Sequence, residues 1–140
     1  MPILYTATST ATGGRAGHVR SSDGALDVPL SMPKEMGGPG GKGTNPEQLF
    51  AAGYAACFES AVQFAAMQDK KKITESSVTA IVGVGPRDQG GGFGLAVELQ
   101  VKLKGVSKAE AEALVATAHN VMCPYSNATR GNVDVKVSVV

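Results

Sequence analysis

Two cysteines are the residues of this chain whose side chains could carry covalent chemistry. Cys57 lies in "GYAACFES", residues 53–60, and Cys123 lies in "MCPYSNATRG", residues 122–131. Such thiols can be small buried hydrophobes, a structural crosslink, metal ligands or a redox pair. Zinc is poorly supported, because the two histidines, His18 and His119, stand at no ligand-like spacing.

A redox pair has physical requirements. The nucleophile is the thiolate, and burial alone would raise the pKa of a thiol above its ordinary value of about 8.5. A cation must therefore lie near the first sulfur, and the second thiol must be able to reach it once it is oxidised. The arginines that could supply the charge are Arg15, Arg20, Arg87 and Arg130.

Glu47 is the other notable charge. It stands ten residues before Cys57, which is about 15 Å along a helix axis and close to three full turns, so both can face the same side without touching. A carboxylate there could hold an arginine that bridges part of the gap. It could equally be no more than a favourable negative charge at a helix N-terminus.

The first cysteine should lie on a long helix. Asn45 is a good N-cap and Pro46 suits the first helical position. Gln48 can close a capping box, and the helix should end near Asp69. Residues at three- and four-residue steps predict one packed face: Leu49, Gly53, Ala56, Cys57, Ser60, Phe64 and Met67. The small side chains in its middle would let another backbone approach closely, so we expect the helix to be central.

Strands are expected on both sides of this helix. Before it, "ILYTAT", "RAGHVRSS" and "ALDVPLS" are short β-rich segments separated by Gly-Gly and Asp-Gly turn signals. After it, "SSVTAIVGVGPRDQGGGFGLAVELQVKLKG", residues 76–105, predicts a long β-hairpin with its turn near residues 87–92.

A second helix should lead to the second cysteine. Ser107 and Glu110 form a capping box, and an apolar stripe follows at Ala111, Leu114, Val115, Ala118 and Met122. Pro124 disfavours helical geometry at the residue before it, so the helix should end near Cys123. The alternating tail "NVDVKVSVV" predicts a final strand. The fold class is therefore α+β, in a single domain over residues 1–140.

Composition narrows the class of protein. The net charge is +1, so no strong field is expected to attract nucleic acid or an acidic membrane. There is no signal-peptide pattern and no run of 18 uninterrupted apolar residues, so we expect a cytoplasmic protein without a membrane span, in which a purely structural disulfide is disfavoured. The glycine-rich loop at residues 36–46 departs from the phosphate-loop pattern at both ends.

The two cysteine motifs resemble those of a known family. "GTNPEQLFAAGYAACF" and "CPYSNATRGNVDV" are similar to the motifs of the organic hydroperoxide resistance (Ohr) proteins, a branch of the OsmC-type thiol peroxidase superfamily. The resemblance extends over essentially the whole chain, and no motif position departs from it. It implies an OsmC-like fold and an intertwined homodimer, in which two central cysteine-bearing helices are wrapped by antiparallel-rich sheets from both chains.

The resemblance also implies roles for particular residues. Cys57 matches the peroxidatic cysteine and Cys123 the resolving cysteine. Arg15, in "TGGRAGH", matches the arginine that stabilises the thiolate, and Glu47, in "NPEQ", matches the glutamate that holds this arginine. The implied reaction passes through a sulfenic acid on Cys57 and a Cys57–Cys123 disulfide.

Substrate and reductant are implied in the same way. Family members reduce organic hydroperoxides, including fatty-acid hydroperoxides, and a dihydrolipoyl group on a lipoylated protein restores their thiols. No bound metal or other cofactor is expected. An apolar pocket should select the substrate, and its candidate lining residues are Met36, Phe50, Phe58, Phe93, Met122 and Tyr125, each of which could equally belong to an ordinary core.

Two other functions remain open from the sequence. One is a redox-sensing binding protein whose disulfide alters an interface. The other is a general thiol–disulfide oxidoreductase, against which the absence of the C-x-x-C spacing counts.

Overall fold

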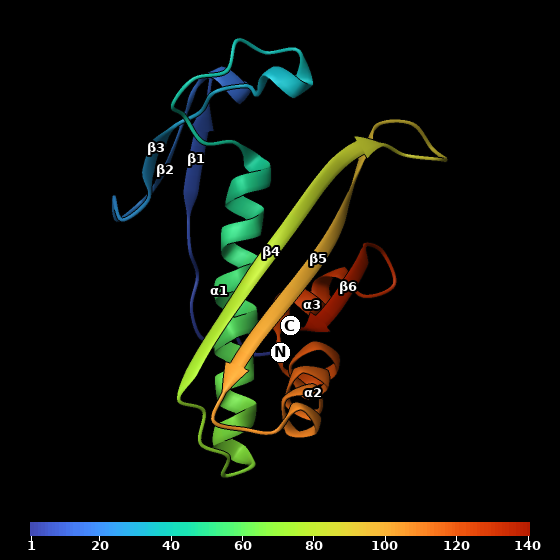
Figure 1. Cartoon of the computed structure of the whole chain (residues 1–140). Helices are drawn as coiled ribbons and strands as arrows, with labels where there is room; N and C mark the ends of the chain where they lie inside the picture. The colour runs from blue at the N-terminus through green and yellow to red at the C-terminus, as the bar shows by residue number, and fades with distance from the viewer. The chain divides into compact units, whose positions relative to one another are not determined.

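The structure is a computed structural model that describes all 140 residues (Figure 1). It divides into two compact units, Met1–Leu49 and Phe50–Val140. Helix α1, Pro46–Gln68, begins in the first unit and continues through the second. That the two units fold as one domain over residues 1–140 stays a prediction.

The first unit is a small antiparallel sheet with two short 3-10 turns. Its strands β1 (Ser9–Thr12), β2 (His18–Ser21) and β3 (Asp27–Pro29) pair in the order β1-β2-β3. The turns are η1 (Gly14–Ala16) and η2 (Lys34–Met36). Gly17 is required where β2 begins, because a Cβ there would lie 1.7 Å from the Thr12 carbonyl oxygen.

The first predicted strand begins later than expected. "ILYTAT" predicts a strand from Ile3, but β1 starts at Ser9 and residues 3–8 belong to no strand. The last residues in register are Ser9 and Ser21, one more bond runs from Ser22 N–H to the Thr8 carbonyl, and the partner strand then turns away through Asp23 and Gly24. A strand needs a neighbour for its hydrogen bonds, so the length of β2 sets the start of β1.

The second unit is built on the predicted hairpin. Strands β4 (Glu75–Pro86) and β5 (Phe93–Lys104) are antiparallel and pair along their whole length. Their turn contains Gly90, Gly91 and Gly92, all at positive φ. The tail forms β6 (Asp134–Val139), which confirms the final strand, and β6 pairs in parallel with β5 to give the order β4-β5-β6.

Three helical segments connect β5 to β6, as a parallel crossover requires. Helix α2 (Lys108–Thr117) begins at the predicted capping box, in which Ser107 and Glu110 bond to each other's backbone N–H. It continues as a π-helical turn, η3 (Ala118–Met122), closed by the bond from Cys123 N–H to the Ala118 carbonyl. The short helix α3 (Pro124–Thr129) then follows, and the sequence did not predict it.

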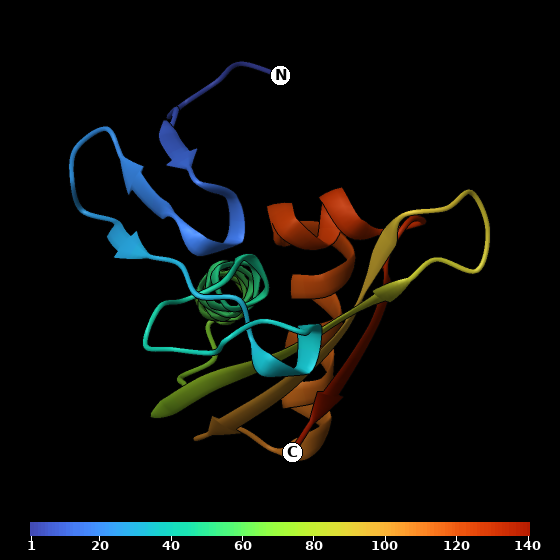
Figure 2. The same ribbon diagram turned by 90° about the horizontal axis from the view of Figure 1, so that it is seen from above.

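The core of the second unit lies between helices and one face of its sheet. Figures 1 and 2 show α1, α2 and α3 on the same side of the sheet. Val97, Leu99 and Val101 of β5 point into this layer and are buried. They meet Tyr54 and Phe58 of α1, both without exposed surface.

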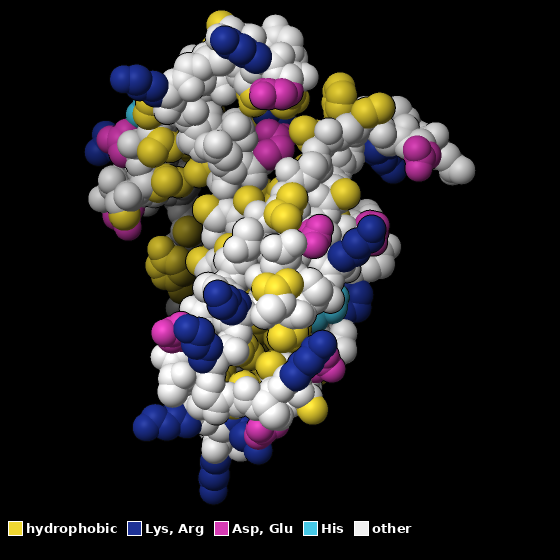
Figure 3. Space-filling view, in the orientation of Figure 1, with side chains coloured by type: hydrophobic (Ala, Val, Ile, Leu, Met, Phe, Trp, Pro, Cys, Tyr) yellow, Lys and Arg dark blue, Asp and Glu magenta, His cyan; other side chains and the backbone are white.

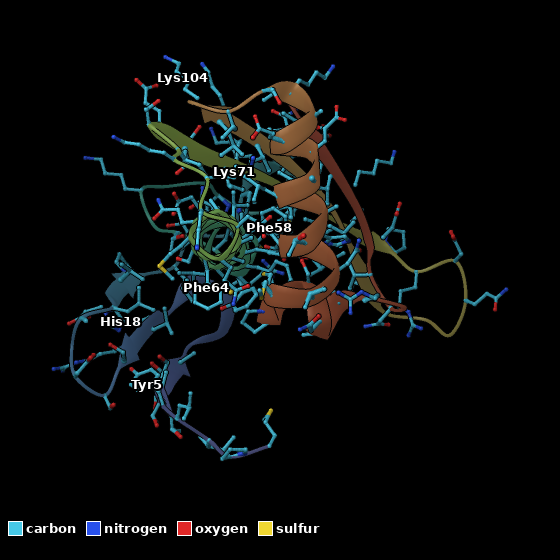
Figure 4. All side chains as sticks on the ribbon, turned by 90° about the horizontal axis from the view of Figure 1, so that it is seen from below. Tyr5, His18, Phe58, Phe64, Lys71 and Lys104 are labelled. Carbon is cyan, nitrogen blue, oxygen red and sulfur yellow. The ribbon has the colours of Figure 1, made fainter.

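The packed face of α1 differs from the predicted one. The buried residues are Tyr54, Phe58, Ala61, Val62, Ala65 and Ala66, whereas Phe64 and Met67 of the predicted face are 45% and 65% exposed. Figure 4 shows Phe58 on the side of α1 towards α2 and Phe64 on another side. A helix that is apolar nearly all round has no single stripe, so the spacing indicated the wrong face.

The apolar character of α1 extends along its whole length. By length and composition alone it could cross a membrane, with a third of the 18-residue window buried inside the chain. The core helix of a globular protein meets the same criteria, and the buried side of α1 packs against β5.

Lysines gather where α1 and β5 end, at the lower end of the molecule in Figure 3. Lys71 lies 2.6 Å from a Glu110 carboxylate oxygen, and Lys104 lies 2.9 Å from one of Glu75. The carboxylates of Glu110 and Glu75 therefore balance two of these positive charges.

Leu99→Ala tests the assignment of the core. Leu99 has no exposed surface and sits in the middle of β5, so the truncation should cost about 2–5 kcal/mol of unfolding free energy through lost burial and a residual cavity. Denaturant unfolding measures it. Leu4→Ala is the matched control, because Leu4 is 97% exposed and should change stability by less than about 0.5 kcal/mol. Equal losses in both variants would contradict this core.

Candidate redox-active cysteine site

The two cysteines meet in the folded second unit. The S–H of Cys123 is directed at Cys57 Sγ across 3.7 Å, and both thiols are free. Cys57 lies in the middle of α1 and is partly exposed, while Cys123 is fully buried at the junction of η3 and α3. Residues 66 positions apart are thus brought to a distance from which a disulfide can form.

Local sequence explains how each sulfur is held. Gly53 lies one turn before Cys57, and a Cβ on it would come within 2.9 Å of the Tyr125 hydroxyl. The missing side chain lets Tyr125 pack against α1. Cys123 is the N-cap of α3, with Pro124 in the first helical position, and its sulfur accepts the backbone N–H of Ser126 at 3.4 Å.

Burial makes the first thiol harder to ionise. It raises the pKa of the Cys57 thiol, the backbone N–H of Tyr125 acts in the opposite direction, and the neighbouring Cys123 thiol raises the pKa further. A thiolate at Cys57 therefore needs a positive charge nearby to offset the effect of burial.

A guanidinium–carboxylate pair is formed in the first unit. Arg15, in η1, donates through both terminal nitrogens to the two carboxylate oxygens of Glu47, each at 2.7 Å. This pairing lowers the pKa of the Glu47 carboxyl and raises the pKa of Arg15. Glu47 lies in the first turn of α1, so the helix that carries Cys57 also carries the anchor of Arg15.

The other candidate arginines have different neighbours. Arg20 lies 3.9 Å from Asp27 on the surface, and Arg87 lies in the β4–β5 turn beside Gly90. Arg130 donates to the His119 carbonyl and the Asn127 side chain. Of the four, Arg15 is the one that Glu47 holds.

The predicted pocket residues fall into separate groups. The backbone N–H of Tyr125 lies beside Cys57, and the ring centroid of Tyr125 is 6.4 Å from that of Phe50. Phe50 and Met122 both pack against the core cluster that contains Cys123. Phe58 is completely buried and fills the core. Phe93 is 74% exposed beside the hairpin turn.

The remaining pocket candidate, Met36, lies in the turn η2 of the first unit. The structure thus brings Phe50, Met122 and Tyr125 together around the cysteines. It does not bring Phe93 to them within this chain.

A group of polar residues beside the cysteines was not predicted. Tyr54 OH lies 2.9 Å from Ser126 Oγ and 3.1 Å from Thr129 Oγ1, and His119 Nδ1 lies 2.9 Å from the same Ser126 oxygen. Tyr54 precedes Cys57 by about one helical turn, which is the one signal the sequence offered. No three His, Cys, Asp or Glu side chains are grouped as a metal would require.

Comparison with known proteins assigns the class. A sequence model of the OsmC-like protein family matches residues 38–138. The organic hydroperoxide resistance protein of Xanthomonas axonopodis pv. citri is 58% identical over 138 residues, which cover 98% of this chain and 95% of that protein. The organic hydroperoxide resistance protein OhrA of Bacillus subtilis is 52% identical over 140 residues, covering 97% of this chain and 96% of that one.

A solved structure agrees with the sequence relatives. The organic hydroperoxide resistance protein OsmC of Legionella pneumophila superposes with a TM-score of 0.92 at 54% identity, covering 99% of this chain and 98% of that one. The chain therefore belongs to the OsmC-like family, and within it to the organic hydroperoxide resistance proteins. The α+β fold with two sheets is confirmed, and membership supports a redox role in resistance to organic hydroperoxides.

Mild oxidation should link Cys57 to Cys123 within one chain, because their sulfurs are already adjacent. One equivalent of diamide, followed by non-reducing peptide mapping, measures the linkage. Cys57→Ser should give no linked peptide. Predominant disulfides between chains would contradict the observed pairing.

Glu47→Gln should destabilise the protein at neutral pH but not in acid. The pKa of the Glu47 carboxyl is lowered by Arg15, so its stabilising effect, on the order of 1 kcal/mol, is fully present above the unfolded value of about 4.3. It is lost as pH falls through the folded pKa. Unfolding free energies of wild type and variant should converge in that range.

The exposed Glu35 provides the control for this measurement. Glu35→Gln should leave stability unchanged at neutral pH. A gap between wild type and Glu47→Gln that persisted at pH 2 would contradict the ion-pair explanation.

Proposed function

We propose that the protein is a thiol-dependent peroxidase that reduces organic hydroperoxides, including fatty-acid hydroperoxides, to alcohols. Cys57 is the nucleophile and Cys123 the resolving thiol. The observation that carries this proposal is the 3.7 Å separation of two free thiols, one partly exposed and one fully buried. Membership of the organic hydroperoxide resistance proteins supports the substrate class.

The first step oxidises Cys57. Its thiolate attacks the terminal oxygen of R–O–OH, the O–O bond breaks, and the alkoxide takes up a proton and leaves as the alcohol. The sulfur becomes a sulfenic acid and the peroxide is reduced by two electrons. Cys57 is suited to this step because it is the more accessible of the two thiols.

Arg15 supplies the charge that this step requires. Burial raises the pKa of the Cys57 thiol, and in this proposal the Arg15 guanidinium opposes that effect and polarises the peroxide. Glu47 orients the guanidinium through the bidentate pair. A guanidinium suits this role because it stays charged at any working pH.

The second step closes a disulfide and the third reopens it. The Cys123 sulfur attacks the sulfenic sulfur, the S–O bond breaks, and water leaves with the thiol proton. A dihydrolipoyl group on a lipoylated protein then exchanges with the disulfide, becoming a cyclic disulfide itself and returning both cysteines to thiols. No cofactor bound by this chain takes part.

The working form is an intertwined homodimer in the cytoplasm, where reductants maintain the thiols. The exposed Phe64 and Met67 of α1 support a partner on that side of the helix. Phe50, Met122 and Tyr125 offer an apolar wall for the R group beside Cys57. Met36, Phe58 and Phe93 stay predictions as pocket residues.

A peroxidase assay tests the function directly. The wild type should consume tert-butyl or lipid hydroperoxide faster than hydrogen peroxide, and dihydrolipoamide should sustain turnover better than glutathione. Cys57→Ser should lose at least about a thousandfold in rate, since removal of a nucleophile abolishes its pathway. Saturable binding without turnover would favour a redox-sensing binding protein instead.

Cys123→Ser separates the two half-reactions. This variant should reduce about one equivalent of peroxide and then stall, with Cys57 passing on to sulfinic and sulfonic acids under excess peroxide. Mass spectrometry of the Cys57 peptide measures the products. A fully active Cys123→Ser variant would remove this cysteine from the resolving role.

Arg15→Ala should raise the pKa of Cys57. Loss of a nearby positive charge shifts a thiol by about 1–3 pKa units, so iodoacetamide alkylation at pH 7 should slow by about tenfold or more. The rate-against-pH curve measures the shift. Arg20→Ala, which removes an exposed arginine paired with Asp27, should leave the curve in place, and an equal shift in both variants would contradict a specific role for Arg15.

A further inference from the structure

A continuous hydrogen-bonded chain lies behind the two cysteines. It runs from His119 Nδ1 to Ser126 Oγ at 2.9 Å, on to Tyr54 OH at 2.9 Å and to Thr129 Oγ1 at 3.1 Å. The Thr129 hydroxyl then donates to the Ser126 carbonyl at 3.2 Å. The peroxidase chemistry described above uses none of these four side chains.

Most of the side chains in this series of hydrogen bonds are buried. Tyr54 and Ser126 have no exposed surface, and Thr129 retains 5%. Buried polar groups are costly unless they are paired, and no buried side-chain polar atom in the structure lacks a partner. This series of hydrogen bonds therefore resists rearrangement, because moving one of its side chains would leave the neighbouring side chains without hydrogen-bond partners.

Only one arrangement of protons satisfies all four bonds at once. A carbonyl can only accept, so the single proton of Thr129 goes to the Ser126 carbonyl and Thr129 Oγ1 accepts from Tyr54. Tyr54 must then accept from Ser126. Ser126 has no further proton, so His119 must donate from Nδ1. Burial, with a smaller effect of the Arg130 charge, lowers the pKa of His119, which favours the neutral ring protonated on Nδ1 near pH 7.

The chain ends at the resolving sulfur. Ser126, whose hydroxyl is fixed by Tyr54 and His119, also directs its backbone N–H at Cys123 Sγ across 3.4 Å. Tyr54 lies on α1 about one turn before Cys57, whereas Ser126 lies on α3 three residues after Cys123. The bond between Tyr54 and Ser126 thus joins the helix of one sulfur to the helix of the other.

We propose that His119 and Tyr54 are positioning residues for the resolving half-reaction, holding Cys123 against Cys57 through Ser126. This inference rests on the proposed function. In the step concerned, Cys57–SOH and Cys123–SH become the disulfide and water: the S–O bond breaks, the S–S bond forms, and Cys123 is oxidised as the sulfenic sulfur is reduced. The sulfurs must close from 3.7 Å to about 2.05 Å. If the Cys123 thiol is not held near Cys57, a second peroxide molecule oxidises the sulfenic acid to sulfinic acid before the disulfide forms.

The first experiment measures that competition. For wild type, Tyr54→Phe, His119→Ala and His119→Asn, the tert-butyl hydroperoxide concentration that converts half of Cys57 to sulfinic acid is found by mass spectrometry. It should fall about tenfold in Tyr54→Phe and His119→Ala, while the rate of the first peroxide reduction stays within twofold of wild type. His119→Asn should recover most of the loss, since its amide can donate to Ser126 from near the Nδ1 position.

The second experiment needs no peroxide. The reduction potential of the Cys57–Cys123 pair, measured in a dithiol redox buffer, reports how well the folded chain presents the two thiols to each other. A tenfold decrease in the equilibrium constant for forming this disulfide raises its reduction potential by about 30 mV. If wild type failed to reduce peroxide, the proposed function would fall, and this measurement would still decide the positioning role.

Matched controls separate positioning from general damage. Tyr5→Phe removes a hydroxyl from a 79% exposed tyrosine, and Ser138→Ala removes one from an exposed position of β6. Both should behave as wild type. If Tyr54→Phe does not fold, the His119→Ala and His119→Asn variants still test the proposal, because His119 is only half-buried. Wild-type potential and wild-type over-oxidation in folded His119→Ala would overturn the proposal.

Discussion

The close approach of helix α3 to helix α1 depends on a residue with no side chain. Gly53 faces Tyr125, and a Cβ there would press on the tyrosine hydroxyl at 2.9 Å and on its ring at 3.2 Å. With this space left free, the rings of Phe50, Tyr54 and Tyr125 gather at centroid separations of 5.7–6.4 Å. Cys123, which packs in the same core cluster as Tyr54, lies with its sulfur 3.7 Å from that of Cys57. The absence of a side chain at this one position therefore permits the packing in which the two sulfurs lie 3.7 Å apart.

The same packing that unites the sulfurs opposes their ionisation. Burial holds the two sulfurs close together but raises the pKa of the Cys57 thiol. The packing that brings the sulfurs together therefore makes the thiolate harder to form. In the mechanism that we propose, the bidentate guanidinium–carboxylate pair would offset the effect of burial, because it orients a permanent charge. Helix α1 carries both Glu47, in its first turn, and Cys57, near its middle.

Sequence reasoning succeeded where the signal was local. The hairpin followed from two alternating runs around a glycine-rich turn, and the start of α2 followed from the reciprocal bonds of Ser107 and Glu110. The N-cap at Asn45 also formed, although Gln48 accepts a hydrogen bond from the Thr44 hydroxyl instead of closing a box. Each of these features depends on residues within a few positions of one another.

The failures share a physical origin. The face of α1 was assigned wrongly because the helix is apolar around most of its circumference, and only the sheet decides which side is buried. The pairing of Arg15 with Glu47 and of Cys57 with Cys123 came from family resemblance, since 32 and 66 residues of chain separate the partners. The bond between Tyr54 and Ser126 spans 72 residues and leaves no periodicity to detect.

The π-helical turn η3 gives the segment before Cys123 room for one residue more than an α-helical turn holds. Its bond joins Cys123 N–H to the Ala118 carbonyl, an i to i+5 spacing. The wider turn takes up the additional residue locally, so deleting a single residue between positions 118 and 122 would restore ordinary helical winding with little change of phase beyond it. The thiol contact could therefore survive such a deletion here, whereas the same deletion within α2 would rotate everything after it by about 100°.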